Sequence, residues 1–555
     1  MPPSSGLPPG LRGDPYLLRI SPRSAKASET ECPAYLAAKA HPALVAEKRV
    51  RKGKHSLETF PLRFVQERID ALEFHSSASA LGSATGQPRP HLHPGLARYV
   101  DQALHHYSPH LHQLTDPELR PVPHYWVARS SHERTWEMFT WGRRYESPDG
   151  TVREFRFLRM GSVERAELAT SAPSRAERSE AEIAIAAHTT AIGRPARWPP
   201  PEEWGQPFPL LGPHRPPGYI RRVRVIEIGL MDGSRNVLFD GAPEEAKARY
   251  EERGRHRHIE IVAGGAPRPG TSCVDCKALM VCEERIWAPG LLGVRTRQAP
   301  LRTVSASDLR YHRQCPAQYH MRALKLPKAD EYAAEHRRGK AVHAWLEDAH
   351  RRAAVHGQPC TPNSVPEAPE TWGETEWALP QEEIRLGIRM LTSHAGVCPF
   401  SSAISHSDPE PDLAFFDAYA NAVVLAKPDL LFYEDGAPVW RETKTRRSGA
   451  TSRRELFRRY PQLALGLLIL HGGHLGEQTE GARVELEVLY PDRLPDLIFL
   501  HADDPIDVEA AKEVLYSLTR SWHGDTSYPA HPHEDACRRC PVSHWCPDAA
   551  LPKEE

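Results

Sequence analysis

The sequence predicts an α/β protein made of two diverged copies of one domain, each with a mixed central sheet flanked by helices and a four-cysteine site. Three observations support this fold class. A cysteine triplet of one spacing occurs twice, a similar basic segment follows a lone upstream cysteine in each copy, and helical and strand periods succeed one another in the second copy. We expect a flexible tail at 1–14, a first copy at 15–290 and a second copy at 300–555.

The composition is that of an ordinary globular protein. The chain has 555 residues, of which 40% are hydrophobic and 26% charged, which excludes a wholly disordered chain. Its longest apolar run, at 463–470, is too short to cross a bilayer, and the first residues lack the pattern of a signal peptide. We therefore expect a cytoplasmic protein without a membrane partner. Because the formal net charge is −1, a nucleic-acid partner has to be inferred from local patches.

The ten cysteines are the most informative residue type. Two triplets share the spacing C-x2-C-x5-C, and a lone cysteine followed by Pro-Ala precedes each of them, which gives the sets Cys32, Cys273, Cys276, Cys282 and Cys315, Cys537, Cys540, Cys546. Four thiolates favour zinc or an iron–sulfur cluster, because sulfur is a soft ligand. Buried thiols without a metal are the alternative. The remaining two, Cys360 and Cys398, are interpreted as ordinary cysteines.

The repeat continues beyond the cysteines. The segment Arg51-Lys52-Gly53-Lys54 follows Cys32, and Arg337-Arg338-Gly339-Lys340 follows Cys315. In the second copy we predict helices at 307–324, capped by Ser307, at 330–356 and at 381–394. Strands at 412–425, 426–433 and 439–445, with a turn at 434–436, then a helix at 460–470, strands at 484–490 and 496–501, and a helix at 506–522 complete this order.

The candidate chemistry lies on the hairpin of the second copy. Glu442 and Lys444 are two residues apart on one strand, so their side chains project from one face, and the hairpin can bring Asp429 beside Glu442. Two carboxylates suit Mg²⁺ or Mn²⁺, which prefer oxygen ligands, and a lysine can orient or deprotonate a water. Charged residues on a solvent-facing strand are the alternative interpretation.

Five segments of the second copy occur in a characteristic order. They are SASDLRYHRQCPAQY, RRGKAVHAWLE, KPDLLFYEDGAPVWRETKT, YPQLALGLLIL and CRRCPVSHWCP. Over most of residues 303–550 the chain resembles the RecB-like PD-(D/E)xK nucleases, which have a restriction-endonuclease-like fold. It is most similar to their iron–sulfur branch, the AddB-type nuclease domains and the nuclease of CRISPR adaptation.

The resemblance implies a role for each matching residue. His343, Asp429 and Glu442 would bind the divalent metal, Lys444 would be the catalytic lysine, and Gln462 would support Lys444 or the DNA. Cys315, Cys537, Cys540 and Cys546 would hold a [4Fe–4S] cluster, with zinc as the alternative, and the first tetrad is a candidate for a second cluster. The family often has Gln-x3-Tyr, whereas this chain has Gly466 at the last position.

Basic and polar residues near the hairpin are candidates for nucleic-acid contacts. Arginines follow the active-site strand closely, and we expect Arg446, Arg447, Arg453 and Arg454 to bind phosphate; a solvated charged face is the alternative. Ser305 and Ser307 are interpreted first as helix-start residues. A histidine group, His105, His106, His110 and His112, lacks a regular ligand spacing and is expected on a surface loop.

The first copy predicts a nuclease-like fold without a nuclease site. Its segment 152–156 aligns with 440–444, so Glu154 matches Glu442, but Arg156 replaces Lys444 and the position of Asp429 falls near Trp141. Arginine stays protonated and cannot act as a general base. The helix expected at 181–192 contains no glutamine. We expect this copy to bind DNA or to brace the second copy.

Together these features predict a divalent-metal-dependent deoxyribonuclease, an exonuclease or an endonuclease. Single-stranded or end-bearing DNA would be its substrate, and the family implies roles in DNA repair, recombination or antiviral defence. The chain has no P-loop of the form G-x4-G-K-[ST], so a motor would have to come from a helicase partner. The alternative is a non-catalytic iron–sulfur subunit that binds DNA within a larger DNA-processing complex.

Overall fold

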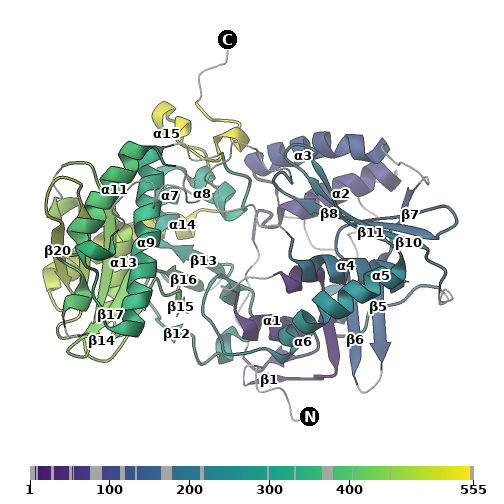
Figure 1. Cartoon of the computed structure of the whole chain (residues 1–555), viewed down its shortest axis with the longest axis horizontal. Coiled ribbons are helices and arrows are strands. Elements are labelled where there is room, and N and C mark those ends of the chain that lie inside the picture. Colours follow the sequence, from purple (N-terminus) through teal and green to yellow (C-terminus); the bar gives the residue numbers. More distant parts are fainter. Residues whose placement is uncertain are drawn as a thin grey trace.

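The computed structural model describes residues 7, 10–26, 31–48, 53, 55–74, 91–112, 119–131, 134–163, 178–212, 218–296, 299–329, 333–365, 379–402, 404–449 and 452–550. The described residues of the first half of the chain, 15–290, and those of the second half, 300–555, form two lobes side by side (Figure 1). The C-terminal segment passes over the region where the two lobes meet. Of the repeated basic segments, residues 51, 52 and 54 lie outside the described part of the chain.

A five-stranded sheet of order β14-β17-β18-β19-β20 forms the centre of the second half. Its strands are β14 (Ile404–Pro409), β17 (Leu430–Glu434), β18 (Ala437–Thr445), β19 (Arg483–Leu489) and β20 (Asp496–His501). The β18–β19 pair is parallel and the other three pairs are antiparallel, so the sheet is mixed as predicted. The turn between β17 and β18 has positive φ at Asp435 and Gly436, which matches a type I′ hairpin.

Helices cover both faces of this sheet. On one face α13 (Pro461–His471) lies between the sheet and α14 (Pro505–Gly524), and its residues are almost all buried, which explains its continuous apolar sequence. On the other face lie α9 (Ala334–His356) and α11 (Gln381–His394). Val439 of β18 packs there against Ala349 and Ala353 of α9. Alternate residues of β18 therefore face different helix layers.

Two predicted elements of the second half are each divided in the structure. The helix expected at 307–324 is α7 (Ala306–Gln314) followed by α8 (Pro316–Ala323), because Pro316 has no N–H to continue α7 and instead starts α8. Ser305, not Ser307, caps α7, in a reciprocal pair with Asp308. The strand expected at 412–425 is a hairpin of β15 (Leu413–Asp417) and β16 (Ala422–Ala426).

The central sheet of the first half has order β11-β10-β8-β7-β4. Its strands are β4 (Arg120–Pro121), β7 (Arg143–Glu146), β8 (Val152–Arg159), β10 (Arg222–Gly229) and β11 (Arg235–Gly241). Only the β8–β10 pair is parallel. Read as β4-β7-β8-β10-β11, the sheet therefore has the same strand directions, pair by pair, as β14-β17-β18-β19-β20. The helix α4 (Glu180–Ile192) packs on β8 and β10, as α13 packs on β18 and β19.

Each half also has a four-stranded sheet, of orders β2-β6-β5-β9 and β13-β16-β15-β12. In both, the first pair is parallel and the second is an antiparallel hairpin. The strands not yet given are β2 (Leu17–Ile20), β5 (Tyr125–Ser131), β6 (Thr135–Phe139), β9 (Arg194–Ala196), β12 (Ile286–Trp287) and β13 (Arg302–Ser305). The short β12 comes from the first half but pairs with β15 of the second.

The cysteine segments pack between the lobes. Leu279, close to Cys282, packs on Ala414 and Phe416 of the second half. In the C-terminal segment, Trp545 packs edge-on against Tyr99 of the first half, with ring centroids 5.1 Å apart. The cysteine segment of each half therefore packs against the other half.

The remaining helices belong mainly to the first half. They are α1 (Pro33–Ala40), α2 (Pro61–Phe74), α3 (Pro94–His112), α5 (Pro243–Arg249), α6 (Arg255–Ala263), α12 (Leu456–Arg459) and α15 (Glu534–Arg538). The expected histidine loop is part of α3, and His110 is buried there. Within the segment expected as a tail, β1 (Leu11–Arg12) pairs with β3 (Val45–Ala46). Among the described residues, no helix is long and apolar enough to span a membrane.

Candidate active site

Asp429, Glu442 and Lys444 meet where β17 begins and β18 ends. Leu430 pairs with Arg441, so the preceding Asp429 stands opposite Glu442. The Nζ of Lys444 donates to Glu442 Oε2 at 2.9 Å and to Asp429 Oδ2 at 3.4 Å. The backbone N–H of Thr443 also donates to Asp429 Oδ2, at 2.6 Å. The structure thus brings together the three residues that the hairpin predicts.

A histidine and a further carboxylate extend this group. The Nδ1 of His343, on α9, lies 3.2 Å from Asp429 Oδ1. Glu410 follows β14, and ligand atoms of His343, Glu410 and Asp429 all lie within 4.8 Å of one another. The Oε2 of Glu410 also pairs with Lys427 Nζ at 2.7 Å. Glu410 was not among the sequence-predicted residues: it lies in a turn of prolines and acids, Asp408 to Asp412, where an acidic residue carries no signal of its own.

The electrostatics of the group follow from buried opposite charges. Burial alone would raise the pKa of Asp429, but Lys444 and His343 hold it below its ordinary value. Burial and the neighbouring Asp429 raise the pKa of Glu442. Burial acts to lower the pKa of Lys444, yet Asp429 and Glu442 raise it above its ordinary value. Lys444 is therefore a cation at neutral pH.

An open cavity of about 510 Å³ gives access to this site. Glu442, Lys444 and Gln462 line it, so the structure places Gln462, in the first turn of α13, on the same cavity as the carboxylate and the lysine. Ser305 and Ser307 line it as well. Gly270 and Thr271 of the first half complete it, just before Cys273.

Gly466 has a packing role in this site. A Cβ at this position would stand 2.9 Å from the ring of Trp440. The absence of a side chain lets α13 approach Trp440, whose Nε1–H donates to Glu442 Oε1 at 3.1 Å. The departure from the family pattern thus coincides with a tryptophan that orients a site carboxylate.

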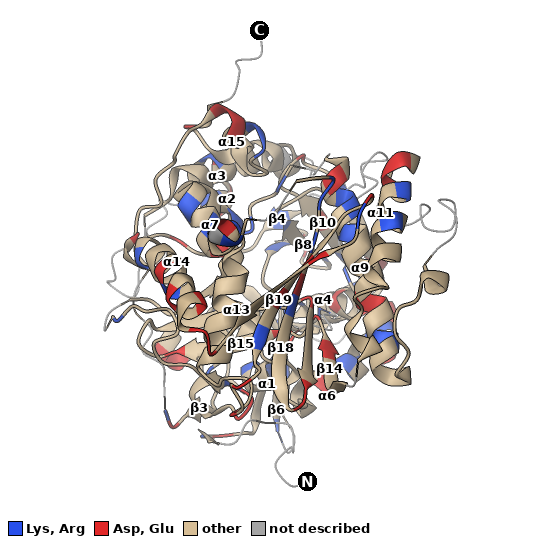
Figure 2. Cartoon of the chain, turned by 90° about the vertical axis from the view of Figure 1, so that its left-hand side faces the viewer, with Lys and Arg blue, Asp and Glu red and all other residues tan. Residues whose placement is uncertain are grey.

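The described side chains of the predicted phosphate-binding arginines do not line the cavity. Arg447 pairs with Glu383 of α11, and Arg453 pairs with Asp507 of α14 at 2.8 Å. Arg446 donates to the hydroxyl of Tyr460 at 3.0 Å. The side chain of Arg454 lies outside the described part of the structure. Acidic and basic residues alternate on α9 and α11 (Figure 2), so this surface is mixed in charge.

In the first half, the matching positions form a closed ion pair. Arg156 Nε donates to Glu154 Oε1 at 2.7 Å, and their side chains are 4% and 2% exposed. The guanidinium also lies over the ring of Tyr145, 3.8 Å from its centroid. Trp141, where the resemblance puts the counterpart of Asp429, packs against Phe60. This arrangement leaves no open carboxylate pair among these residues.

Each cysteine tetrad comes together in space. Cys32, Cys273, Cys276 and Cys282 line one small cavity of about 20 Å³. Backbone N–H groups of Tyr35 and Arg268 donate to Cys32 Sγ at 3.4 and 3.3 Å. Cys540 interacts electrostatically with Cys315, Cys537 and Cys546. The N–H of His531 donates to Cys315 Sγ at 3.4 Å.

The donor set at the hairpin fits a hard divalent cation. Asp429, Glu442 and Glu410 offer carboxylate oxygens, which Mg²⁺ and Mn²⁺ prefer, and His343 adds one nitrogen. Beside such an ion, a fixed ammonium group can hold a water or offset phosphate charge. The arrangement can therefore support metal-assisted hydrolysis of a phosphate ester.

Comparison with known proteins bears mainly on the second half. Residues 303–547 match the family model of the PD-(D/E)XK nuclease superfamily. A crystal structure of an exonuclease-like protein from Eubacterium rectale is 12% identical, with 40% of this chain and 82% of that chain covered and a TM-score of 0.27. The structure of SSO0001 is 13% identical, with 46% and 89% covered and a TM-score of 0.20. No curated protein matches the chain.

Proposed function

We propose that the chain is a divalent-metal-dependent nuclease that hydrolyses phosphodiester bonds of DNA in the cavity beside β18. The observation that carries this proposal is the meeting of Asp429, Glu442 and Lys444, of which Glu442 and Lys444 line a cavity open to solvent. The family match over residues 303–547 supports the same reaction class. Single-stranded or end-bearing DNA is the proposed substrate.

The proposed metal ligands are Asp429, Glu442 and His343. Glu410 is a further candidate, because its ligand atom lies within 4.8 Å of those of His343 and Asp429. A bound Mg²⁺ or Mn²⁺ would supply Lewis-acid stabilisation of phosphate charge. Trp440 holds one oxygen of Glu442 and the Thr443 N–H holds one oxygen of Asp429, so the carboxylates are fixed before substrate binds.

Lys444 is proposed to act as a cation. Because its pKa is raised by the two carboxylates, it holds its proton at neutral pH and donates hydrogen bonds. It would orient the attacking water and offset the negative charge that develops on phosphate. Gln462, on the same cavity, is proposed to hold Lys444 or the DNA backbone in place.

The first half is proposed to be a diverged copy that has lost its catalytic set. Five strands in the same order, with the same directions, support the duplication. The buried Glu154–Arg156 pair occupies the positions of Glu442 and Lys444. Through Gly270 and Thr271 this half also lines the catalytic cavity, which supports a role in positioning DNA.

The cysteine tetrads are proposed to hold iron–sulfur clusters. Around a single zinc ion, thiolate sulfurs lie about 3.8 Å apart, since each Zn–S bond is about 2.3 Å. Among the described residues, the groups whose ligand atoms all lie within 4.8 Å of one another include neither tetrad. Sulfurs bound to different irons of a cubane lie further apart, so the spacing favours a cluster.

A nuclease assay tests the proposal directly. The full chain, purified without oxygen, is incubated with labelled single-stranded, blunt-ended and circular DNA in the presence of Mg²⁺, Mn²⁺ or EDTA. We expect metal-dependent cleavage that Lys444→Ala abolishes. If the wild type cuts none of these substrates but binds DNA, the non-catalytic iron–sulfur subunit becomes the better description. DNA repair, recombination and antiviral defence remain the proposed settings.

A further inference from the structure

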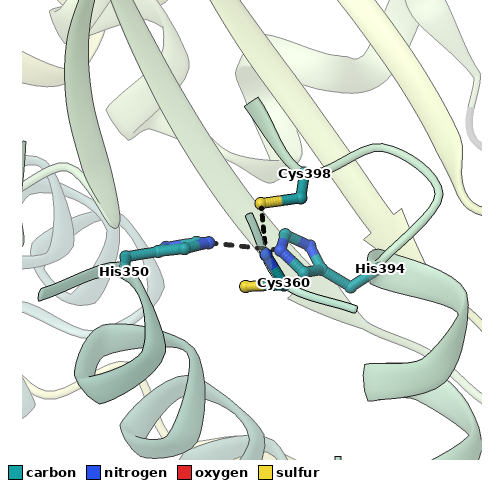
Figure 3. Close-up of side chains that lie close together, drawn as sticks. All are labelled: His350, Cys360, His394 and Cys398. Carbon is teal, nitrogen blue, oxygen red and sulfur yellow. Dashed lines mark hydrogen bonds between the residues drawn. The ribbon is translucent and has the colours of Figure 1, made fainter. Parts of the chain in front are cut away.

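Four metal-ligating side chains meet behind the catalytic strand, on the face of the sheet opposite the cavity. His350, Cys360, His394 and Cys398 are 3%, 6%, 0% and 3% exposed. Their ligand atoms all lie within 4.8 Å of one another, and the side chains point toward a common centre (Figure 3). The sequence interpretation of Cys360 and Cys398 as ordinary cysteines missed this group.

The four residues come from two helices and from the segments that follow them. His350 lies on α9, and Cys360 follows after Gly357 ends that helix in the left-handed conformation. His394 is the last residue of α11, and Cys398 starts the short helix η7 (Pro399–Ser401). Because α9 and α11 pack side by side, the two histidine–cysteine pairs face each other.

His394 is oriented as a metal-bound histidine usually is. The Nδ1 of His394 donates to Glu487 Oε1 of β19 at 2.6 Å, which leaves its Nε2 directed at the centre of the group. The other oxygen of Glu487 accepts from the Thr443 hydroxyl at 3.1 Å. A carboxylate that holds the far ring nitrogen is the usual outer partner of a metal-bound histidine.

The spacing of the nitrogens fits one tetrahedral ion. The Nε2 atoms of His350 and His394 lie 3.2 Å apart. Zinc–nitrogen bonds of about 2.0–2.1 Å at a tetrahedral angle place two nitrogens about 3.3 Å apart. Two thiols and two imidazoles form the donor set of many closed zinc sites. The surroundings are apolar, with Phe400, Leu430 and Phe432 in the same buried cluster, so the polar atoms have few other partners there.

We propose that His350, Cys360, His394 and Cys398 bind a structural zinc ion. Four protein ligands leave no open position for substrate, so the ion would hold the fold rather than take part in hydrolysis. It would fasten the ends of α9 and α11 to the sheet, and through Glu487 and Thr443 it would brace the strand that carries Lys444. The site is separate from both cysteine tetrads and from the hairpin carboxylates.

The wild-type protein provides the first test. Full-length protein is purified under reducing conditions, its zinc and iron are counted, and the zinc X-ray absorption spectrum is recorded. We expect one zinc per chain with two sulfur and two nitrogen neighbours. Zinc held by a cysteine tetrad would instead give an all-sulfur shell. If the protein as purified lacks zinc and the reduced protein takes up none when Zn²⁺ is added, the proposal is overturned.

Matched variants provide the second test. Cys398→Ser and His394→Gln should each lose this zinc, whereas Cys276→Ser, in the first tetrad, should keep it. Zinc content unchanged in both of the first two variants would overturn the assignment. A Cys360–Cys398 disulfide, detected by intact mass without reductant, would overturn it as well. Because the spectrum of the wild type needs no variant, the test holds even where a substitution prevents folding.

Discussion

Lys444 Nζ donates to Glu442 Oε2 at 2.9 Å, across two positions of one strand, and this contact joins the cation of the site to its most enclosed carboxylate. Both side chains face the cavity, as strand alternation requires. The ion pair is held from behind, because Trp440 donates to the other oxygen of Glu442. The predictions below begin from this pair.

Lys444→Ala should lower the DNA cleavage rate by about 10²–10³ or more, because it removes a preorganised cation while leaving the metal ligands. DNA binding and the circular dichroism spectrum should stay close to those of the wild type. Lys444→Arg keeps the charge and should retain part of the activity. Single-turnover cleavage measures these rates, and a Lys444→Ala variant of normal rate would show that the active site lies elsewhere.

Glu410→Gln should raise the Mn²⁺ concentration for half-maximal cleavage by about 10–100-fold, the range seen for residues that hold or orient metal ligands. At saturating Mn²⁺ the rate should recover, because Asp429 and Glu442 remain. Glu509→Gln, an exposed carboxylate on α14, is the matched control and should change nothing. Equal metal dependence of the Glu410 variant and the control would remove Glu410 from the site.

Arg156→Ala should lower the free energy of unfolding by up to about 3–5 kcal/mol, because it leaves the buried Glu154 with only the longer contact to Arg224, at 3.5 Å. Cleavage per folded molecule should hardly change, since the first half is proposed to lack a nuclease site. The double variant Glu154→Leu/Arg156→Met removes both charges and should be less destabilised. Urea unfolding followed alongside cleavage separates the two effects, and loss of activity without loss of stability contradicts the assignment.

The protein purified without oxygen should be brown and contain iron. Cys546→Ser should lose the iron of the second tetrad. It should also destabilise the C-terminal segment, whose Trp545 packs against Tyr99, because a bound cluster adds its binding energy to folding. Ser543→Ala, between the same cysteines, should keep the iron. Visible absorption and iron analysis show whether a cluster is bound. A colourless wild type with stoichiometric zinc in an all-sulfur shell would reject the cluster.

The first half should lose stability as the pH falls below about 6.5. Burial lowers the pKa of His188 and of His258 from the ordinary 6.5 to about 4. Between about pH 4 and pH 6.5 the unfolded chain therefore binds protons that the folded chain does not. Each histidine accounts for up to about 3 kcal/mol over this window. His188→Phe keeps the stack on Tyr250 and should flatten the dependence, unlike the exposed His256→Gln. Urea unfolding at pH 7 and pH 5 measures the difference.

Much of the second half could be predicted from the sequence, because its patterns are local. The hairpin turn needs only Asp435 and Gly436, and the apolar run of α13 follows from its position between a sheet and a helix. The division at Pro316 could also have been found, since proline removes the N–H that a continuous helix requires.

Other features depend on long-range packing that no spacing reveals. Glu410 becomes a candidate ligand only because β14 ends beside Asp429, where its N–H donates to the Asp429 carbonyl at 3.3 Å. Cys360 and Cys398 each follow a histidine in sequence, but only the packing of α9 on α11 brings the two histidine–cysteine pairs together. The ion pairs of Arg447 and Arg453 likewise depend on helices distant in sequence.

The alternation of β18 has a consequence for how this chain can vary. Glu442 and Lys444 face the cavity, whereas Thr443, between them, faces the carboxylate that holds His394. A one-residue insertion or deletion within the strand would exchange the two faces, sending the lysine toward the histidine–cysteine group and the threonine into the cavity. Length changes should therefore be confined to the Asp435–Gly436 turn, and both sites should be kept or lost together across descendants of this sequence.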